Sequence, residues 1–246
     1  MVTGIIPARY ESSRFPGKPL VDIHGKSMLQ RVVEQCLKAK LDRVVVATDD
    51  ERIRAHVAAF GGEVILTNTA HRSGTDRVAE AASKLQLPND SIVVNIQGDE
   101  PFIEPQDINL LTACFENSNT EIATLVKKIK TADVLENPNC PKVVLNNHGE
   151  ALYFSRAAIP HLKNIKKEDW HKRHTFYKHI GIYGFRATIL NEISTLAPSL
   201  LEQSEGLEQL RWLEHGFRIQ TAETQSECLA VDHPDDLIRI DKKFFS

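Results

Sequence analysis

The residues best suited to hold a ligand stand near the start of the chain, in a loop that follows an apolar strand. Guanidinium, ammonium and hydroxyl groups are side chains that bind phosphate oxygens. The segment from Ile5 to Leu20 carries such groups on Arg9, Ser12, Ser13, Arg14 and Lys18. Gly17 lets the backbone come close to a bound group. The amides at the start of the next predicted helix would face the same space, so the pattern predicts a polyphosphate site.

The sequence lacks the two most familiar phosphate motifs. It contains neither G-x-x-x-x-G-K-[ST] nor G-x-G-x-x-G, so it supports neither a P-loop NTPase nor a dinucleotide-binding Rossmann site. A basic loop of this kind is also compatible with a solvated surface loop whose arginines face water. Its position after a buried-looking strand favours a ligand, because ligands of open α/β sheets collect at the carboxyl ends of strands.

A second chemical signal follows the strand-like run Ser91–Ile96. The chain continues with the letters QGDEP, which places Asp99 at the carboxyl edge of the sheet, where the basic loop would also lie. A carboxylate repels a polyphosphate unless a cation lies between them, and Mg²⁺ prefers such oxygen ligands. Asp99 is therefore a candidate magnesium ligand. The alternative is a Gly-Asp turn in which Asp99 caps the following segment.

The sequence VDHPDD near the end of the chain forms a third acidic site. Asp232 follows a strand-like stretch, Arg218–Glu223, and precedes the last predicted helix. One interpretation makes it the N-cap of that helix, with Pro234 and Asp235 in the first turn. The other places it opposite Asp99 as the second ligand of a metal site, and the spacing alone leaves both open.

The elements that must position these residues alternate between strands and helices. Strands are predicted at Thr3–Pro7, Arg43–Thr48, Glu63–Leu66 and Ser91–Ile96. Helices are predicted at Ser27–Ala39, Asp50–Ala59, Gly74–Leu85 and Pro105–Glu116. Apolar β-branched runs that alternate with helical periods are typical of βαβ units, so we expect an α/β fold with a Rossmann-like, mostly parallel sheet.

The pattern changes after Glu121. Longer strands are predicted at Ile122–Ile129, Lys142–Leu145, Ala151–Phe154 and Ile180–Phe185. They indicate a smaller, mixed α+β lobe that is partly antiparallel. The segment His161–His179 is rich in Lys, Arg and His, and we expect most of it to be a mobile basic surface loop.

Composition and charge exclude several classes of protein. The chain has 246 residues, 41% of them hydrophobic, which is enough for a sizeable core. Lys and Arg total 30, Asp and Glu total 33, and the net charge of −3 indicates neither nucleic acid nor a membrane surface as a partner. No apolar run approaches the ~20 residues of a membrane span. We expect a cytoplasmic protein with reduced thiols at Cys36, Cys114, Cys140 and Cys228.

A set of segments occurs in a fixed order along nearly the whole chain. In chain order they read PARYESSRFPGKPL, TDD, HRSGTDR, VNIQGDEP, ALYFSR, HIGIYGFR, LEQLR and VDHPDDL. Together they resemble the 3-deoxy-manno-octulosonate (Kdo) cytidylyltransferase family. The resemblance implies one domain of the nucleotide-diphospho-sugar transferase type over residues 1–246. Within it, about residues 1–120 plus 217–246 would bind the nucleotide, and about residues 121–216 would form a sugar-binding and dimerisation lobe.

The resemblance also implies the reaction and part of its site. CTP and Kdo would give CMP-Kdo and pyrophosphate for lipopolysaccharide assembly, with Arg9, Lys18 and Asp99 as catalytic residues. The positions that match nucleotide-binding residues of the family are Arg9, Ser12, Ser13, Arg14, Lys18, Ser73, Gly74 and Arg77. Asp99 and Asp232 match its Mg²⁺ ligands. Before Asp232 this chain reads SECLA where many family members carry a glycine-containing turn, so the match is weaker there.

A sugar-acid pocket is implied in the same way. The matching positions are Gln97, Arg156, His179, Tyr183, Glu208 and Gln209. A guanidinium such as that of Arg156 binds a carboxylate in bidentate fashion. Without the resemblance, His179 and Tyr183 would be interpreted as core residues with satisfied polar tips, and Glu208 and Gln209 as a solvated helix face. The number of matches in the second lobe favours the pocket.

Three functions from different classes follow. The first is a Kdo cytidylyltransferase, in which the anomeric hydroxyl attacks the α-phosphorus of CTP in line. The second is a related nucleotidylyltransferase for another sugar acid, such as sialic acid or an amino-Kdo. The third is a non-catalytic nucleotide-binding regulator on the same scaffold. The family resemblance and the apolar strands Ala151–Phe154 and Ile180–Phe185 further predict a homodimer through the second lobe.

Overall fold

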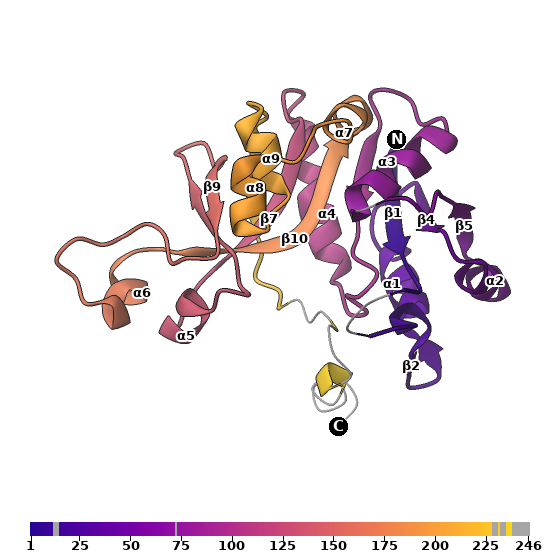
Figure 1. Ribbon diagram of the computed structural model, residues 1–246, viewed down its shortest axis with the longest axis horizontal. Coiled ribbons are helices and arrows are strands. Elements are labelled where there is room, and N and C mark those ends of the chain that lie inside the picture. Colours follow the sequence, from indigo (N-terminus) through magenta and orange to yellow (C-terminus); the bar gives the residue numbers. More distant parts are fainter. Residues whose placement is uncertain (12–14, 72, 228–230, 232–234, 238–246) are drawn as a thin grey trace. The chain divides into compact units, whose positions relative to one another are not determined.

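The computed structural model describes residues 1–11, 15–71, 73–227, 231 and 235–237 of the chain (Figure 1). These residues form two compact units. The first comprises Met1–Asn109, Arg186–Ser194 and the described residues from 227 onward, and the second comprises Leu110–Phe185 and Thr195–Ser226.

The first unit is built on a parallel sheet. Its strands, in spatial order, are β6 (Ile92–Asn95), β1 (Val2–Ala8), β4 (Arg43–Thr48) and β5 (Glu63–Leu66). Ile5 of β1 lies opposite Val45 on one side and Asn95 on the other. The apolar runs of β1, β4 and β6 are buried, as expected for parallel strands covered on both faces. All four strands were predicted from the sequence, and the predicted parallel α/β fold is confirmed.

Helices pack on this sheet, and α1, α2 and α3 each begin at a residue whose side chain caps the helix. The helices of the first unit are α1 (Met28–Cys36), α2 (Glu51–Ala59), α3 (Gly74–Lys84) and α7 (Ala187–Ile193), and α4 (Pro105–Ala113) runs from the first unit into the second. The side chains of Ser27, Asp50 and Ser73 accept hydrogen bonds from backbone amides of α1, α2 and α3. A short hairpin, β2 (Asp22–Ile23) and β3 (Lys26–Ser27), precedes α1.

The second unit holds a mixed sheet. Its strands are β11 (Ile219–Glu223), β7 (Ile122–Lys128), β10 (Tyr177–Arg186), β8 (Lys142–Leu145) and β9 (Ala151–Ser155). β11 pairs with β7 in parallel, and the pairs β7–β10, β10–β8 and β8–β9 are antiparallel. The predicted mixed lobe is therefore confirmed. The helices of this unit are α5 (Ala132–Glu136), α6 (Trp170–Arg173), α8 (Leu200–Glu205) and α9 (Gln209–Glu214).

An aromatic cluster fills the core between β10 and α9. The ring of Trp212 packs edge-on against Tyr183 and Phe185, with centroids 5.0 and 5.4 Å apart. Gly184 of β10 leaves room for Phe115, because an added Cβ would lie only 2.7 Å from that ring. This packing fixes the position of Tyr183 within the strand.

The prediction for the segment His161–His179 is wrong in part. It includes a 3₁₀ turn at Lys167–Asp169, helix α6 and the start of β10. Trp170 and Phe176 are buried with Ile129 and Leu135, and the Trp170 indole donates to the carbonyl of Ile165 at 3.0 Å. The reason is that two aromatic side chains anchor a segment whose Lys and Arg content suggested a solvated loop.

The boundaries of the two units differ from the predicted division. Residues 217–226 lie in the second unit because β11 pairs with β7. Residues 186–194 lie in the first unit because α7 packs against α3 and β6. The assignment of sugar binding and dimerisation to the second lobe stays a prediction.

Two expectations from composition concern thiols and membranes. Cys36, Cys114 and Cys140 are free, as predicted, and Cys228 lies outside the described residues. Within the part of the chain that the structure describes, no helix is both long and apolar enough to cross a membrane.

Candidate active site

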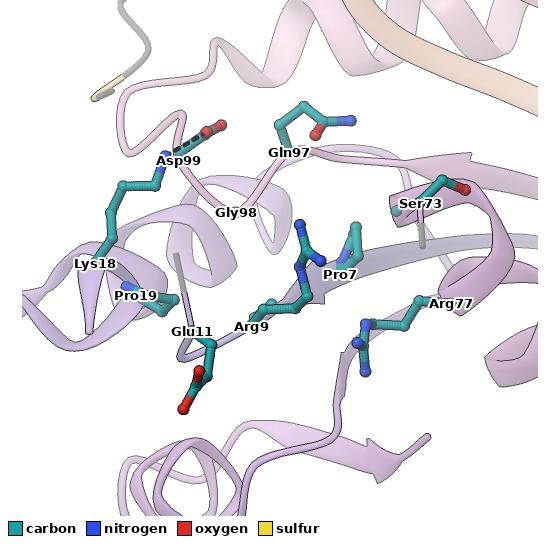
Figure 2. Close-up of a pocket in the computed structure, with 12 residues that line it drawn as sticks. Pro7, Arg9, Glu11, Lys18, Pro19, Ser73, Arg77, Gln97, Gly98 and Asp99 are labelled. Carbon is teal, nitrogen blue, oxygen red and sulfur yellow. Dashed lines mark hydrogen bonds and ion pairs between the residues drawn. The ribbon is translucent and has the colours of Figure 1, made fainter. Parts of the chain in front are cut away.

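A pocket opens in the first unit at the carboxyl edge of its parallel sheet. β1 and β6 run in the same direction, so the segments that follow them, from Arg9 and from Gln97, emerge at the same edge. Together with the start of α3 they enclose a cavity of about 240 Å³ (Figure 2). Its lining residues include seven predicted site residues, namely Arg9, Lys18, Ser73, Gly74, Arg77, Gln97 and Asp99.

Lys18 and Asp99 form an ion pair at this pocket. The Lys18 ammonium donates to Oδ2 of Asp99 at 2.7 Å (Figure 2). It also donates to the carbonyl of Val231 at 2.8 Å. The side chains are 15% and 29% exposed, so both remain in reach of a ligand. A cation and a carboxylate therefore meet where the sequence predicted a phosphate group and a metal ion.

The loop geometry holds Lys18 in this position. Gly17 has φ = 72°, a left-handed conformation that favours glycine, and its amide donates to the carbonyl of Tyr10 at 2.9 Å. A Cβ at Gly17 would also lie 3.3 Å from the Tyr10 ring. Lys18 then begins a 3₁₀ turn, Lys18–Leu20, in which the ring of Pro19 fixes the φ angle of that residue. The arginine that projects into the pocket in Figure 2 is Arg9.

Arg77 is bound inside the protein rather than free in the pocket. Its side chain is 1% exposed and donates to Asp49 at 2.8 Å and to the hydroxyl of Thr67 at 2.5 Å. The hydroxyl of Ser73 accepts a hydrogen bond from the amide of Asp76, and this bond caps the start of α3. Ser73, Gly74 and Arg77 all line the pocket, and their role in cytidine recognition stays a prediction.

The segment after β6 packs tightly against β1. An added Cβ at Gly98 would lie 3.0 Å from the carbonyl oxygen of Pro7, so only glycine fits there without movement. The next carboxyl, that of Glu100, is buried, and its Oε2 has no hydrogen-bond partner among the described residues. Burial, with the charges of Asp99 and Asp107 adding to it, raises the pKa of Glu100 to about 7.

Buried polar groups gather in the second unit around β10. Nε2 of His179 lies 3.0 Å from the hydroxyl of Thr124. The Tyr183 hydroxyl and Nε2 of Gln209 are buried without a hydrogen-bond partner among the described residues. Burial, followed by the negative charge of Glu208, raises the pKa of Tyr183 well above its usual value. Gln209 therefore does not lie on a solvated helix face, and the polar tip of Tyr183 is not satisfied within the described protein.

Backbone carbonyls hold the guanidinium of Arg156 in the same unit. The guanidinium donates to the carbonyls of Glu205, Pro138 and Gly206 at 2.6, 3.0 and 3.2 Å. The ammonium of Lys142 donates to the carbonyl of Arg156 itself at 2.6 Å, and burial lowers the pKa of that ammonium. The Glu205 carboxylate accepts from the amide of Arg156 at 2.9 Å. Arg156 is thus fixed in place before any ligand binds.

The predicted site residues fall into three groups. Those of the pocket, Gln97 included, lie in the first unit, whereas Arg156, His179, Tyr183, Glu208 and Gln209 lie in the second. The predicted nucleotide-binding residues Ser12, Ser13 and Arg14 and the predicted metal ligand Asp232 lie outside the described residues.

Comparisons with known proteins assign the chain to a family. Residues 3–220 match the family described as Cytidylyltransferase. The 3-deoxy-manno-octulosonate cytidylyltransferase of Parabacteroides distasonis is 55% identical over 95% of this chain and 94% of its own length. The enzyme of that name from Vibrio parahaemolyticus is 47% identical over 96% and 94%. The chain belongs to the 3-deoxy-manno-octulosonate cytidylyltransferase family.

Solved structures agree with this membership. A CMP:2-keto-3-deoxy-manno-octonic acid synthetase complexed with CTP is 42% identical, covers 98% of this chain and 97% of its own, and has a TM-score of 0.90. A cytidylyltransferase from Leptospira borgpetersenii, 16% identical with a TM-score of 0.61 over 98% and 94% of the two chains, shares the fold alone. The predicted family, fold class and enzyme class, a nucleotidyltransferase, are therefore confirmed.

Several residues that contact the predicted site residues were not themselves predicted from the sequence. Asp49 belongs to the TDD segment that supported the resemblance, but nothing there indicated that it pairs with Arg77. Thr124, Lys142 and Glu205 lie in ordinary strand and helix patterns, and only their contacts with His179 and Arg156 distinguish them. The one signal in the sequence was the lysine at the start of the apolar strand KVVL, which indicates that Lys142 needs polar partners.

Proposed function

We propose that this protein transfers the cytidylyl group of CTP to Kdo, with release of pyrophosphate, and so supplies CMP-Kdo for lipopolysaccharide assembly. The observation that carries the proposal is the pocket formed by Arg9, Lys18 and Asp99 at the carboxyl edge of the sheet. Relatives that are 47–56% identical and bear the name of this activity support it.

The cations of the pocket act on the phosphates. Arg9 and Lys18 bind the triphosphate and neutralise the negative charge that grows on the departing pyrophosphate, which stabilises the transition state for phosphoryl-group chemistry. Ser73, Gly74 and Arg77 belong to the nucleotide side of the pocket, with Arg77 fixing the start of α3 through Asp49. Ser12, Ser13 and Arg14 complete the nucleotide-binding set.

The donor set at Asp99 suits Mg²⁺. Mg²⁺ is commonly bound in nucleotide sites through one or two carboxylates together with substrate phosphates, so one carboxylate beside phosphate-binding cations is enough. Asp99 would hold the ion, and Asp232 is the second proposed ligand. A bound Mg²⁺ supplies Lewis-acid neutralisation of phosphate oxygens. No cluster of three or more metal-binding side chains occurs in the described part of the chain.

The second unit binds the sugar acid. Three of the five N–H donors of the Arg156 guanidinium serve carbonyls, so two remain for the sugar carboxylate. The buried Tyr183 hydroxyl and Gln209 amide, which have no hydrogen-bond partner among the described residues, offer hydrogen bonds to sugar hydroxyls that would offset the cost of their desolvation. The partly buried imidazole of His179 offers a further one. Glu208 belongs to the same proposed set, and Gln97 of the first unit is its remaining member.

The reaction needs no covalent enzyme intermediate. The anomeric hydroxyl of the sugar acid attacks the α-phosphorus of CTP in line, the bond to the β-phosphate oxygen breaks, and pyrophosphate leaves. No described side chain is an evident general base for the attacking hydroxyl. Positioning of CTP by Arg9 and Lys18, and of the sugar acid by Arg156, supplies much of the rate.

The proposed enzyme is a cytoplasmic homodimer. Exposed leucines on the second unit support an interface there, since Leu152, Leu200 and Leu201 are 58%, 79% and 37% exposed. Strand Ala151–Phe154 thus keeps one exposed apolar side chain. The apolar residues of Ile180–Phe185 are already buried within the chain, so that part of the predicted interface is wrong.

A substrate panel tests the proposal. Pyrophosphate release is measured with CTP, UTP and ATP, each against Kdo, amino-Kdo and N-acetylneuraminate. We expect turnover with CTP and Kdo at least tenfold above every other pair. Preference for N-acetylneuraminate or amino-Kdo would support the related nucleotidylyltransferase instead, and binding of CTP without any turnover would indicate a regulator.

A further inference from the structure

Thr124 makes an unusual set of contacts in the second unit. Its side chain is fully buried in β7. The hydroxyl lies 2.8 Å from the carbonyl oxygen of Ile182, 3.1 Å from that of Ile180, and 3.0 Å from Nε2 of His179. Opposite it, the β7–β10 register shifts between Ile180 and Tyr183, so β10 bulges at this point. The Thr124 hydroxyl therefore contacts both the bulged backbone of β10 and the imidazole of His179.

The hydrogen bonds of this hydroxyl can be assigned from its chemistry. A hydroxyl has one proton to donate and two lone pairs to accept with. The carbonyls of Ile180 and Ile182 only accept, so the Thr124 proton is committed to them. The contact with His179 is then a hydrogen bond only if Nε2–H donates to the hydroxyl oxygen.

The state of the imidazole follows. Although His179 keeps some exposed surface, burial of its ring lowers its pKa to about 3, so it is neutral at physiological pH. Phe154 and Tyr183 lie around the ring, with centroids 5.1 and 5.3 Å away. A neutral imidazole with a proton on Nε2 has a free lone pair on Nδ1. Among the described residues, Nδ1 has no hydrogen-bond partner.

We propose that Thr124 is a positioning residue that fixes the Nε2–H tautomer of His179, so that Nδ1 accepts a hydrogen bond from a hydroxyl of the sugar acid. The proposal rests on the proposed function for the identity of the ligand. Thr124 acts through His179 and does not touch the reacting atoms. The bulge in β10 determines which tautomer of His179 is favoured, because it brings two carbonyls within hydrogen-bond distance of the Thr124 hydroxyl.

The first test measures the tautomer directly. Protein labelled with ¹⁵N-histidine is examined at pH 7 without substrates, and the His179 signals are assigned by their loss in His179→Gln. We expect the pattern of a neutral ring protonated at Nε2. A ring protonated at Nδ1, or an imidazolium, would overturn the proposal. This measurement needs neither a variant of Thr124 nor any turnover.

The second test uses matched variants in steady-state kinetics. Thr124→Val removes the hydroxyl and keeps the shape, Thr124→Ser restores it, and Thr221→Val is the control, because the Thr221 hydroxyl donates to the carbonyl of Gly149 at 2.7 Å in the same unit. Loss of a fixed hydrogen-bond acceptor should raise the KM for Kdo about tenfold in Thr124→Val, while the KM for CTP changes less than about twofold. Thr124→Ser and Thr221→Val should stay near the wild-type values.

The outcomes separate this proposal from the function on which it rests. An unchanged tautomer and an unchanged KM for Kdo in Thr124→Val would refute the role of Thr124 even if the enzyme makes CMP-Kdo. The expected tautomer in a protein that does not turn over Kdo would refute the proposed function while supporting the role of Thr124. If Thr124→Val does not fold, the wild-type spectrum still decides the question, because a ring protonated at Nδ1 would overturn the proposal.

Discussion

At the residue scale, the chemistry of the first unit depends on the pairing of Lys18 with Asp99. The ammonium bridges the carboxylate and the carbonyl of Val231, which joins three parts of the chain far apart in sequence. Both side chains are partly exposed, so solvent weakens the pair and phosphate or metal ions compete for its members. The pair therefore acts as a pre-positioned set of ligand groups more than as a stabilising contact.

Replacement of Lys18 tests the role of the cation. Lys18→Ala should lower kcat about 100- to 1,000-fold at saturating CTP, by analogy with the loss of one preorganised transition-state donor. Lys26→Ala is the control, because Lys26 forms an exposed ion pair with Glu34 and should leave kcat unchanged. Initial rates of pyrophosphate release and far-UV circular dichroism are the measurements. Unchanged turnover in a folded Lys18→Ala protein would sink the proposed role.

Replacement of Asp99 separates metal binding from nucleotide binding. Asp99→Asn keeps the shape but removes the charge, so the Mg²⁺ concentration for half-maximal activity should rise at least about tenfold. The affinity for CTP measured calorimetrically in EDTA should change much less. Wild-type protein should need Mg²⁺ or Mn²⁺, and full activity in excess EDTA would refute the metal scheme.

At the scale of elements, a buried arginine ties α3 to the sheet edge. Arg77 of α3 bonds Asp49, which follows β4, and Thr67, which follows β5. The start of α3 lines the pocket, so the same side chain that stabilises the unit also places the Ser73 and Gly74 backbone. In the second unit the bulge of β10 also positions side chains. The ring centroids of His179 and Tyr183, which flank the bulge, lie 5.3 Å apart.

Removal of the buried arginine should cost stability. Arg77→Met leaves the Asp49 carboxylate without its partner, and the free energy of unfolding should fall by about 3 kcal/mol. Arg54→Met, which breaks an exposed pair with Glu51, should cause no measurable change in urea unfolding. The double variant Asp49→Asn with Arg77→Met should lose less than the sum of the two single variants. Strict additivity would mean that the two side chains do not interact.

At the scale of the whole molecule, the low pKa of His179 links stability to pH. In the unfolded chain the imidazole has a pKa near 6.5, whereas burial lowers it to about 3 in the folded protein. As the pH falls from 6.5 toward 3, the unfolded state takes up a proton that the folded state does not, so stability decreases. The slope should approach about 1.4 kcal/mol per pH unit.

Urea unfolding of the wild type and His179→Gln at pH 7, 6 and 5 measures this contribution. Protonation of Glu100 has the opposite effect on stability between its usual pKa of 4.5 and its folded-state pKa of about 7. Because both proteins contain Glu100, the difference between their free energies of unfolding isolates the contribution of His179. The wild type should lose stability relative to His179→Gln as the pH falls. Parallel curves would show that the imidazole is not desolvated in the native state.

The proposed homodimer is the other prediction at this scale. An apolar interface should persist on dilution and at high salt, because salt screens charges and does not weaken apolar contacts. Sedimentation from micromolar to nanomolar concentrations should show one species of dimer mass. Leu152→Asp together with Leu200→Asp should shift it toward monomer, with exposed Leu66→Asp on the first unit as the control. A monomer at every concentration would disprove the dimer.

The sequence by itself determined the four parallel strands of the first unit, the helices α1 to α4, the carboxyl edge that carries Arg9 and Asp99, and the family. Each of these depends on local periodicity or on ordered motifs, which a linear chain displays directly. Only the tertiary structure decided that Lys18 meets Asp99, 81 residues away, and that Thr124 meets His179, 55 residues away. Such contacts depend on strand register and on a bulge in β10, and no residue pattern marks either. For the same reason, the aromatic anchors in His161–His179 were hidden by the charges around them.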